Sequence, residues 1–381
     1  MTTPYYVYNI DVLRNRIDHI KNELPDIPLT FSIKANSFVL DYILKDVSHV
    51  EVCSPGELHI CEKLSINPDK IIYSGVMKEE IDIHEAISYG VHILTAESKR
   101  HFSLISQMAQ KLGKTVNVIL RISSDNQFGM DPEDIYEIVS PKEKYNNINL
   151  YGFHFYSGTQ KRKIKQIESD VQTIENVVNT CKAKFGFEPT LVEYGPGLAV
   201  DYFKENGEGE DLELLQTIAP VLRDFAKRVP LGIEMGRFVI ASCGSYYTSV
   251  KDIKTNYGIQ YVILDGGIHH LKYYGQIMAM HSPQIVQNPQ RTGNKLKYCL
   301  CGSLCTVSDV LVKEAELYEL QIDDVITFEK CGAYSITESS SLFLSRDMPA
   351  VYIQENGNIK KVRGLVNSSV INTPGYNVKM G

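Results

Sequence analysis

Three short stretches of this sequence carry residue types that together could bind and activate one small molecule. "FSIKANSF" places Lys34 at the end of an apolar run, "YGPGL" supplies Gly195 and Gly197, and "EMGR" sets Glu234 close to Arg237. Glycine turns offer backbone N–H groups to a phosphate, and arginine adds a charge-assisted contact. An amine able to form an imine, a phosphate cradle and a carboxylate that keeps a pyridine nitrogen protonated are what pyridoxal phosphate requires. The residues therefore predict a site for that cofactor.

Taken singly these residues are weak signals, because a lysine at the end of a strand is usually just a solvated lysine. The elements around them give them weight. Apolar, β-branched runs alternate with amphipathic stretches of helical spacing, which is typical of a parallel sheet wrapped by helices. The eight runs are "LTFSIKA", "HVEVCS", "KIIYSGV", "VHILTA", "VNVILRIS", "LYGFHFYSG", "TLVEYG" and "LGIEMG". They predict an α/β fold, a (β/α)8 or TIM barrel over residues 24–240.

The carboxyl ends of the strands carry the chemistry in such a barrel, since they all meet on one face. Lys34 ends the first predicted strand, and residues 154–159 end the sixth. Gly195 and Gly197 follow the seventh strand, and residues 234–237 end the eighth. We therefore expect these four groups to converge.

The composition and the apolar periodicity of the sequence change after residue 240. Tyr- and Val-rich alternating segments such as "SYYTSVKDIK", "IQYVILDGG" and "PAVYIQENGNIKKVRG" are separated by turn signals. This pattern predicts a C-terminal β-sandwich or β-barrel domain, which the first strand, "PYYVYN", could join. The predicted second domain is therefore residues 1–23 plus 241–381.

Composition narrows the class of partner. The net charge of −7 argues against a nucleic-acid partner, which would favour a basic face. No stretch approaches the roughly 20 apolar residues of a membrane span, and the amino terminus lacks the apolar core of a signal peptide. The eight cysteines are spread thinly, which favours reduced thiols over disulfides or a metal site. We expect a cytoplasmic protein with a small-molecule substrate, no metal and no membrane contact.

Seven motifs in this order resemble the fold type III pyridoxal-phosphate decarboxylases, the group of diaminopimelate, ornithine and arginine decarboxylases. They are "SIKANS", "VEVCSPGEL", "GFHFYSGTQ", "YGPGL", "EMGR", "CGSLCTVSDVL" and "CGAYSI". The resemblance covers almost the whole chain. It implies decarboxylation of the α-carboxylate of an L-amino acid or a conjugate of one, by a homodimer in which the second domain of each subunit contributes to a shared active site.

The resemblance also implies roles for individual residues. Lys34 would be the Schiff-base lysine, Glu234 the partner of the pyridine nitrogen, and Cys305, from the other subunit, the proton donor. A thiol suits that step because it is mostly protonated at neutral pH yet able to give up its proton. Without the motif, a buried small apolar residue is the more common reading of a cysteine. The remaining cofactor contacts would come from His154, Tyr156, Thr159, Gly195, Gly197, Gly236, Arg237 and Tyr334.

The sequence departs from the family pattern at four positions. Tyr156 stands where most members place a histidine against the cofactor ring, Pro196 interrupts three glycines, and Met235 replaces a proline. The fourth departure is Thr306, which stands where relatives acting on basic amino acids carry an acidic residue. A buried ammonium without that carboxylate would be costly. The substrate is therefore expected to have a neutral or acidic distal end.

Two basic features fit that expectation, and each has an ordinary alternative. Arg346 could bind an anionic group of the substrate, or it could be an exposed arginine beside Asp347. The cluster Lys161-Arg162-Lys163 could receive a carrier-bound or siderophore-like substrate, or it could be a solvated helix face.

Two rival functions use the same cofactor. An alanine-racemase-like isomerase shares the barrel and a second domain. Racemases place an arginine against the ring nitrogen, whereas this sequence has Glu234 at that position, so Glu234 argues against a racemase. A non-catalytic pyridoxal-phosphate carrier consists of a barrel alone. The predicted second domain, with Cys305 and Tyr334, therefore argues against a carrier.

Overall fold

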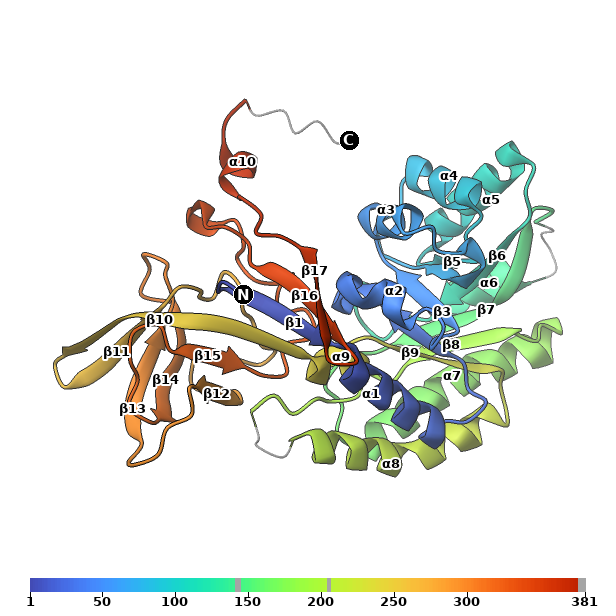
Figure 1. Ribbon diagram of the computed structural model, residues 1–381. Helices are drawn as coiled ribbons and strands as arrows, with labels where there is room; N and C mark the ends of the chain where they lie inside the picture. The colour runs from blue at the N-terminus through green and yellow to red at the C-terminus, as the bar shows by residue number, and fades with distance from the viewer. Residues whose placement is uncertain (141–144, 204–206, 376–381) are drawn as a thin grey trace. The chain divides into compact units, whose positions relative to one another are not determined.

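The computed structural model describes residues 1–140, 145–203 and 207–375 (Figure 1). The chain divides into two compact units. The barrel unit comprises Ile17–Ala199 and Asp211–Phe238, and the β unit comprises Met1–Arg16, Val200–Glu210 and Val239–Gly381. Compared with the predicted domain bounds, the division falls inside the first helix and moves residues 200–210 into the β unit. Helix α1 (Ile10–Glu23) follows strand β1 (Tyr5–Asn9) without a loop, so it starts in one unit and ends in the other.

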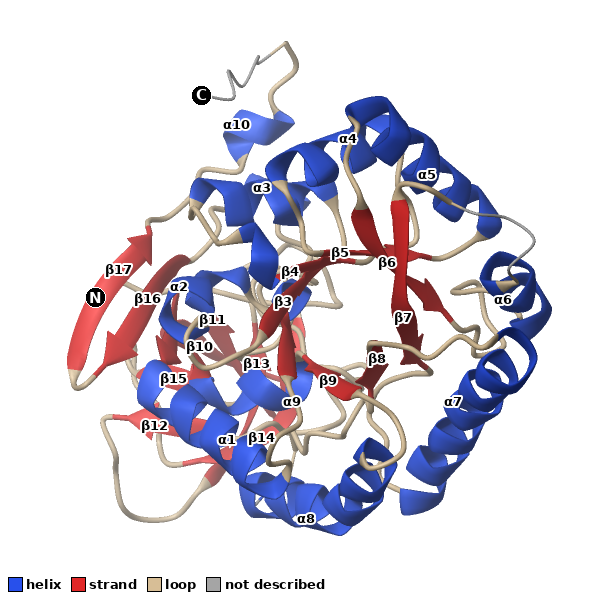
Figure 2. Cartoon of the chain, turned by 90° about the vertical axis from the view of Figure 1, so that its right-hand side faces the viewer, coloured by secondary structure: helices blue, strands red, loops and turns tan. Residues whose placement is uncertain are grey.

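The barrel unit is a closed ring of parallel strands, as predicted. Among the described residues its eight strands are β2 (Leu29–Ser32), β3 (His49–Val52), β4 (Ile71–Tyr73), β5 (Ile93–Ala96), β6 (Val116–Arg121), β7 (Ile148–Tyr156), β8 (Leu191–Gly195) and β9 (Leu231–Met235). Strand β9 closes the ring by pairing with β2, with Thr30 opposite Glu234. Figure 2 shows the ring of strands surrounded by helices.

Helices connect the strands around the outside of the ring. They are α2 (Leu40–Ile43), α3 (Pro55–Lys63), α4 (Glu80–Tyr89), α5 (Lys99–Leu112), α6 (Pro132–Val139), α7 (Ile164–Phe185) and α8 (Gly207–Ala226), and the short helix α9 (Arg237–Ile240) follows the last strand of the ring. Local sequence sets their ends. Ser54 and Ser98 accept hydrogen bonds from the third residue of α3 and α5, and Gly113 and Gly186 end α5 and α7 in the left-handed conformation.

The interior of the ring changes from apolar to polar along the strands. Ile72, Ile93, Ile119 and Leu191 form one buried cluster. Side chains in a strand alternate between its two faces, so the next inward positions lie two residues further on. Those positions carry Ser74, Thr95, Arg121 and Glu193, all of them buried. The polar layer therefore lies toward the carboxyl ends of the strands.

The β unit contains one mixed sheet, which confirms the predicted C-terminal β domain. Among the described residues its nine strands are β1, β10 (Gly244–Asn256), β11 (Ile259–Leu264), β12 (Ile285–Asn288), β13 (Leu296–Cys301), β14 (Val310–Leu317), β15 (Val325–Phe328), β16 (Ala350–Glu355) and β17 (Asn358–Arg363). The first strand joins this sheet between β10 and β16. Helix α10 (Ser369–Asn372) follows near the carboxyl end. No helix within the described ranges has the length and apolarity needed to cross a bilayer.

Candidate active site

Lys34 lies just beyond strand β2, at the carboxyl-terminal face of the barrel. Lys34 was predicted to end this strand. The strand instead ends at Ser32, and Lys34 lies in the short 3-10 turn Ile33–Ala35 that follows. Its Nζ contacts Glu51 and lies 3.6 Å from Glu234 Oε1. The Lys34 side chain is 37% exposed, whereas the Glu51 and Glu234 side chains are 4% and 7% exposed. Two buried carboxylates thus orient an amine that remains reachable from solvent.

Glu234, on β9, is held by hydrogen bonds from its neighbour strand β2 and from β7, two strands away in the ring. Ser32 Oγ donates to Glu234 Oε1 at 2.9 Å, and His154 Nε2 lies 3.0 Å from Glu234 Oε2. Burial alone would raise the pKa of Glu234, but the Lys34 charge and the hydrogen bonds of His154 and Ser32 outweigh it. The pKa therefore lies well below its ordinary value, so the carboxylate keeps its negative charge. Such a group can accept a hydrogen bond from a protonated ring nitrogen.

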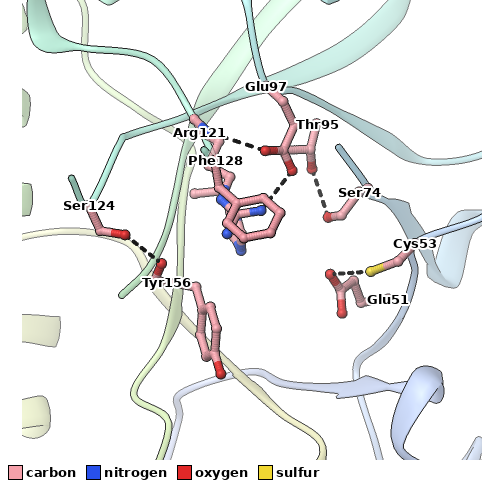
Figure 3. A network of polar contacts seen from close by, with 12 residues as sticks. Glu51, Cys53, Ser74, Thr95, Glu97, Arg121, Ser124, Phe128 and Tyr156 are labelled. Atoms are coloured by element: carbon pink, nitrogen blue, oxygen red, sulfur yellow. Dashed lines mark hydrogen bonds and ion pairs between the residues drawn. The ribbon is translucent and has the colours of Figure 1, made fainter. Parts of the chain in front are cut away.

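Two further residues at Lys34 were not among the predicted site residues. Glu51 lies on β3, and Cys53, just beyond that strand, donates to Glu51 Oε1 at 3.0 Å (Figure 3). Cys53 Sγ is 3.5 Å from Lys34 Nζ. Burial and the charge of Glu51 raise the pKa of the Cys53 thiol well above its ordinary value, so Cys53 is a neutral donor here. The signal for Glu51 was present in "HVEVCS", as an acidic residue inside a strand.

A buried ion pair lies at the same end of the ring. Arg121 Nη1 donates to Glu97 Oε1 at 2.7 Å (Figure 3). The Gly129 amide donates to Glu97 Oε2 at 3.2 Å. The Phe128 ring covers the guanidinium, with 4.7 Å between Arg121 Cζ and the ring centroid. These contacts fix the side chain of Arg121, the last residue of β6, within the polar layer of the ring.

A further buried glutamate, Glu193, lies on β8 and was also missed. It is 1% exposed, and it fits because Gly232 on β9 has no side chain. A Cβ at Gly232 would lie 2.6 Å from Glu193 Oε2. Burial raises the pKa of Glu193 to about 8, and the charges of Glu234 and Glu51 add to the increase. Glu193 is therefore mostly protonated at neutral pH, in contrast to Glu234.

The loops after β7 and β8 are joined by their backbones, which brings the predicted glycine turns together. The Lys161 amide donates to the Gly197 carbonyl at 2.9 Å, and the Ala199 amide donates to the Lys161 carbonyl at 3.1 Å. Gly197 has φ +60°, and a Cβ there would lie 1.9 Å from the Gly158 carbonyl oxygen. Only glycine allows this approach. The resulting cradle of backbone groups is suited to an anion such as a phosphate.

The remaining predicted residues of the barrel unit lie around this cradle. Tyr156 ends β7, and burial is the main cause of its raised pKa, so its hydroxyl stays protonated. A Cβ at Gly195 would lie 2.7 Å from Tyr156 Cδ2, so glycine there makes room for the tyrosine ring. Thr159 lies in the loop after β7. Gly236 packs against the Lys34 turn, 3.0 Å from Ala35 Cβ if a Cβ were added, and Arg237 begins α9.

The predicted residues of the β unit lie on two loops. Cys305 is exposed, and Thr306 follows it in the loop between β13 and β14. Arg346 Nη2 donates to the Ser303 carbonyl of that loop at 2.9 Å. Tyr334 lies on the loop after β15 and adopts φ +62°, in the left-handed region.

The residues of the barrel unit fit pyridoxal phosphate. The cofactor requires a reachable amine, a stable carboxylate and a site for its phosphate. Lys34, Glu234 and the cradle around Gly197 provide these three features at one end of the ring. Glycine is required at position 197 because the Gly158 carbonyl approaches it closely, and this contact holds the two loops of the cradle together.

Comparisons with known proteins agree with this chemistry. Residues 10–241 match the family model for the pyridoxal-binding domain of pyridoxal-dependent decarboxylases. The chain is 26% identical to the L-glutamyl-[BtrI acyl-carrier protein] decarboxylase of Niallia circulans, over 95% of this chain and 91% of that protein. It is 27% identical to the 2-[(L-alanin-3-ylcarbamoyl)methyl]-2-hydroxybutanedioate decarboxylase of Staphylococcus aureus, over 91% of this chain and 92% of that protein.

The fold also matches a solved structure. Diaminopimelate decarboxylase from Helicobacter pylori, complexed with L-lysine, superimposes with a TM-score of 0.84. The match has 24% sequence identity and covers 97% of this chain and 95% of that chain. The family model spans more than half of the sequence and coincides with the ring that carries Lys34 and Glu234. The chain therefore belongs to the pyridoxal-dependent decarboxylases and is an enzyme that uses pyridoxal phosphate.

Proposed function

We propose that this enzyme removes the α-carboxylate of an L-amino acid, or of a conjugate of one, whose distal end is neutral or acidic. When bound, the cofactor supplies an electron sink for the electron pair released from the breaking C–C bond. Lys34 would hold the cofactor covalently, and Glu234 would keep its ring nitrogen protonated. His154 and Ser32 would maintain the charge of Glu234 through the two hydrogen bonds described above.

The phosphate would be bound by backbone and side-chain donors at the carboxyl-terminal face of the ring. The cradle around Gly195 and Gly197 would supply N–H groups, with Gly236 and Arg237 adding an amide and a positive charge. Thr159 would contribute its hydroxyl, and Tyr156 would stack on the ring. Tyr334 is proposed as a further phosphate contact from the β unit.

The final proton would come from Cys305. We propose that this exposed thiol acts in the active site of the partner subunit of a homodimer, where it protonates Cα after the carboxylate has left. This assignment rests on the motif "CGSLCTVSDVL" and on the exposure of the thiol in the described chain.

The observation that carries the substrate class is the loop around Thr306. The only carboxylate in the sequence of residues 302–309 is Asp309. Asp309 is buried, and its oxygens accept hydrogen bonds from the amides of Ile268 at 2.8 Å and Leu304 at 2.7 Å. It therefore organises the loop and is not free to neutralise an ammonium. Arg346, held to the same loop, instead places a positive charge nearby.

The names of two relatives support this proposal. One acts on an L-glutamyl group carried by an acyl-carrier protein, and the other acts on a substrate that contains a hydroxybutanedioate. In the first the amino acid is a conjugate, and in the second the substrate is acidic. Arg346 and Thr306 are compatible with substrates of both kinds.

The decisive experiment compares a free diamino acid with its distally acylated form. We expect a higher kcat/KM for the acylated substrate, because an ammonium without a partner carboxylate keeps its desolvation penalty. Thr306→Glu should shift the preference toward the free diamino acid. Ser308→Glu, which adds the same charge two residues away at an exposed position, is the matched control and should shift it less. Faster carbon dioxide release from the free diamino acid by the wild type would contradict the proposal.

A further inference from the structure

The first residue of the basic cluster after β7 departs from the solvated helix face considered from sequence. Lys161 is 6% exposed, whereas Arg162 and Lys163 are exposed. The Lys161 amine contacts Asp170 on α7 and the hydroxyl of Ser157, and it lies 6.0 Å from the centroid of the Tyr194 ring. Lys161 is thus part of the interior, and the solvated helix face is wrong for this residue.

Asp170, on α7, accepts from three donors, two from the loop after β7 and one from β8. Besides Lys161, it accepts hydrogen bonds from Ser157 Oγ at 2.8 Å and Tyr194 Oη at 2.7 Å. Asp170 is 8% exposed, so the pair is largely shielded from water. A buried ion pair usually gives no more stability than well-packed apolar residues would, because both charges lose their hydration. Stability alone is therefore a weak reason for this arrangement.

The position of the network suggests another reason. Ser157 directly precedes Gly158, and Tyr194 directly precedes Gly195, so the network holds the residues just before these two glycines. The backbone of Lys161 also carries the two hydrogen bonds that join the loops. The side chain and the backbone of one residue therefore fix both loops against α7.

We propose that Lys161 is a positioning residue for the cofactor phosphate, an inference that rests on the proposed cradle. Its ion pair with Asp170 locks the loops after β7 and β8 in the geometry that aims their N–H groups at the phosphate. It also neutralises a buried carboxylate that would otherwise repel the phosphate dianion. Lys161→Met would unlock the loops and leave the charge of Asp170 uncompensated. Asp170→Asn would weaken the ion pair but leave the positive charge of Lys161 beside the loops.

The test titrates the apoenzyme with pyridoxal phosphate and, separately, with pyridoxal, which lacks the phosphate. We expect Lys161→Met to lower the affinity for pyridoxal phosphate about tenfold or more, on the scale of one charge-assisted contact, and the affinity for pyridoxal about twofold at most. Lys165→Met, which removes an exposed lysine of α7, is the matched control and should change neither affinity. An unchanged ratio of the two affinities in Lys161→Met would overturn the inference.

Two further variants make the result decisive. Asp170→Asn weakens the ion pair but leaves the Lys161 charge in place, so it should lower the affinity for pyridoxal phosphate by less than about tenfold, and a larger loss would overturn the inference even if Lys161→Met does not fold. Arg237→Met tests the cradle itself. If Arg237→Met also leaves the ratio of the two affinities unchanged, the proposed phosphate site is wrong. If Arg237→Met lowers the affinity for pyridoxal phosphate relative to pyridoxal and Lys161→Met does not, the proposed phosphate site is supported and the role of Lys161 is wrong.

Discussion

At the scale of single residues, the polar layer of the ring is arranged around one amine. Lys34 lies against Glu51 and Glu234, and its charge contributes to the low pKa of Glu234. Glu193, which has no such cation beside it, has a raised pKa instead. Buried carboxylates of one layer are thus assigned opposite protonation states by their neighbours. An anionic Glu234 is what separates this site from that expected of an alanine-racemase-like isomerase.

The first prediction concerns Lys34. Lys34→Ala should fold, because the side chain is partly exposed, but it should not be labelled when borohydride reduces the cofactor onto the protein. Peptide mapping of the reduced wild type should find the label on Lys34. Lys165→Ala, at an exposed position of α7, should label like the wild type. A label on another lysine, such as the buried Lys78, would contradict the assignment.

The second prediction concerns Glu193 and pH. The unfolded chain releases this proton near pH 4.5, whereas the folded protein keeps it up to about pH 8. Between these values the folded state binds more protons, so the free energy of unfolding should fall with rising pH, by about 1.4 kcal/mol per pH unit at most. Glu193→Gln removes this dependence.

Thermal unfolding of the apoenzyme at pH 5, 6.5 and 8 measures that effect. The loss of Tm between pH 5 and pH 8 should be smaller in Glu193→Gln than in the wild type. Glu168→Gln, on the exposed side of α7, should behave like the wild type. Equal pH dependence in all three proteins would show that Glu193 is ionised in the folded state.

At the scale of elements, the site is made by loops that strands β7 and β8 hold side by side. Paired strands alone do not bring their loops into contact, and here the additional contacts are the backbone hydrogen bonds of Lys161 and the close approach of Gly197 to Gly158. Helix α7 supports the same loops through Asp170. The proposed phosphate cradle therefore depends on the loops after β7 and β8 and on α7.

The third prediction separates backbone strain from close approach. Gly197→Ala and Gly186→Ala both place alanine at a positive φ, which costs about 1–2 kcal/mol. Gly186, which ends α7, has no neighbouring atom within 4 Å of an added Cβ, whereas Gly197 has one at 1.9 Å. Gly197→Ala should therefore lower the Tm more and also weaken pyridoxal-phosphate binding. Equal effects of the two changes on cofactor affinity would contradict the cradle.

At the scale of the whole molecule, the proposed chemistry is divided between the two units. The barrel unit carries Lys34 and the cradle, while the β unit carries Cys305, Thr306 and Tyr334. With these proposed residues, the β unit would have a role that a cofactor carrier made of a barrel alone would not need. If Cys305 acts in the site of a partner subunit, two defective chains can complement each other.

The fourth prediction tests that sharing. Mixing the inactive variants Lys34→Ala and Cys305→Ala should restore about a quarter of wild-type activity in a two-fold dimer, because about half of the dimers are mixed and each has one intact site. Subunit exchange must be verified with differently tagged chains. Cys181→Ala, which changes a buried cysteine of α7, is the control and should not need complementation. No recovery despite exchange would place both residues in the same chain's site.

The sequence by itself determined the ring and most of the residues at its mouth. Periodic apolar runs located all eight barrel strands, and the ends of four runs located Lys34, Tyr156, Gly195 and Glu234. This succeeds because alternation, strand length and glycine turns are local properties of the chain. The glycines could be predicted because the backbone geometry they allow is a property of the residue itself.

Only the tertiary structure decided which charges meet. Glu51 and Glu193 were visible as acidic residues inside strands, but the Lys34 amine that contacts Glu51 follows another strand of the ring, and Gly232, which makes room for Glu193, also lies on another strand. The cluster at 161–163 reads as a uniform basic run, yet its first lysine is buried against Asp170, nine residues further on, and its second and third are exposed. Burial and charge pairing depend on which strands and helices pack together, and this packing sets the protonation of Glu193 and Glu234.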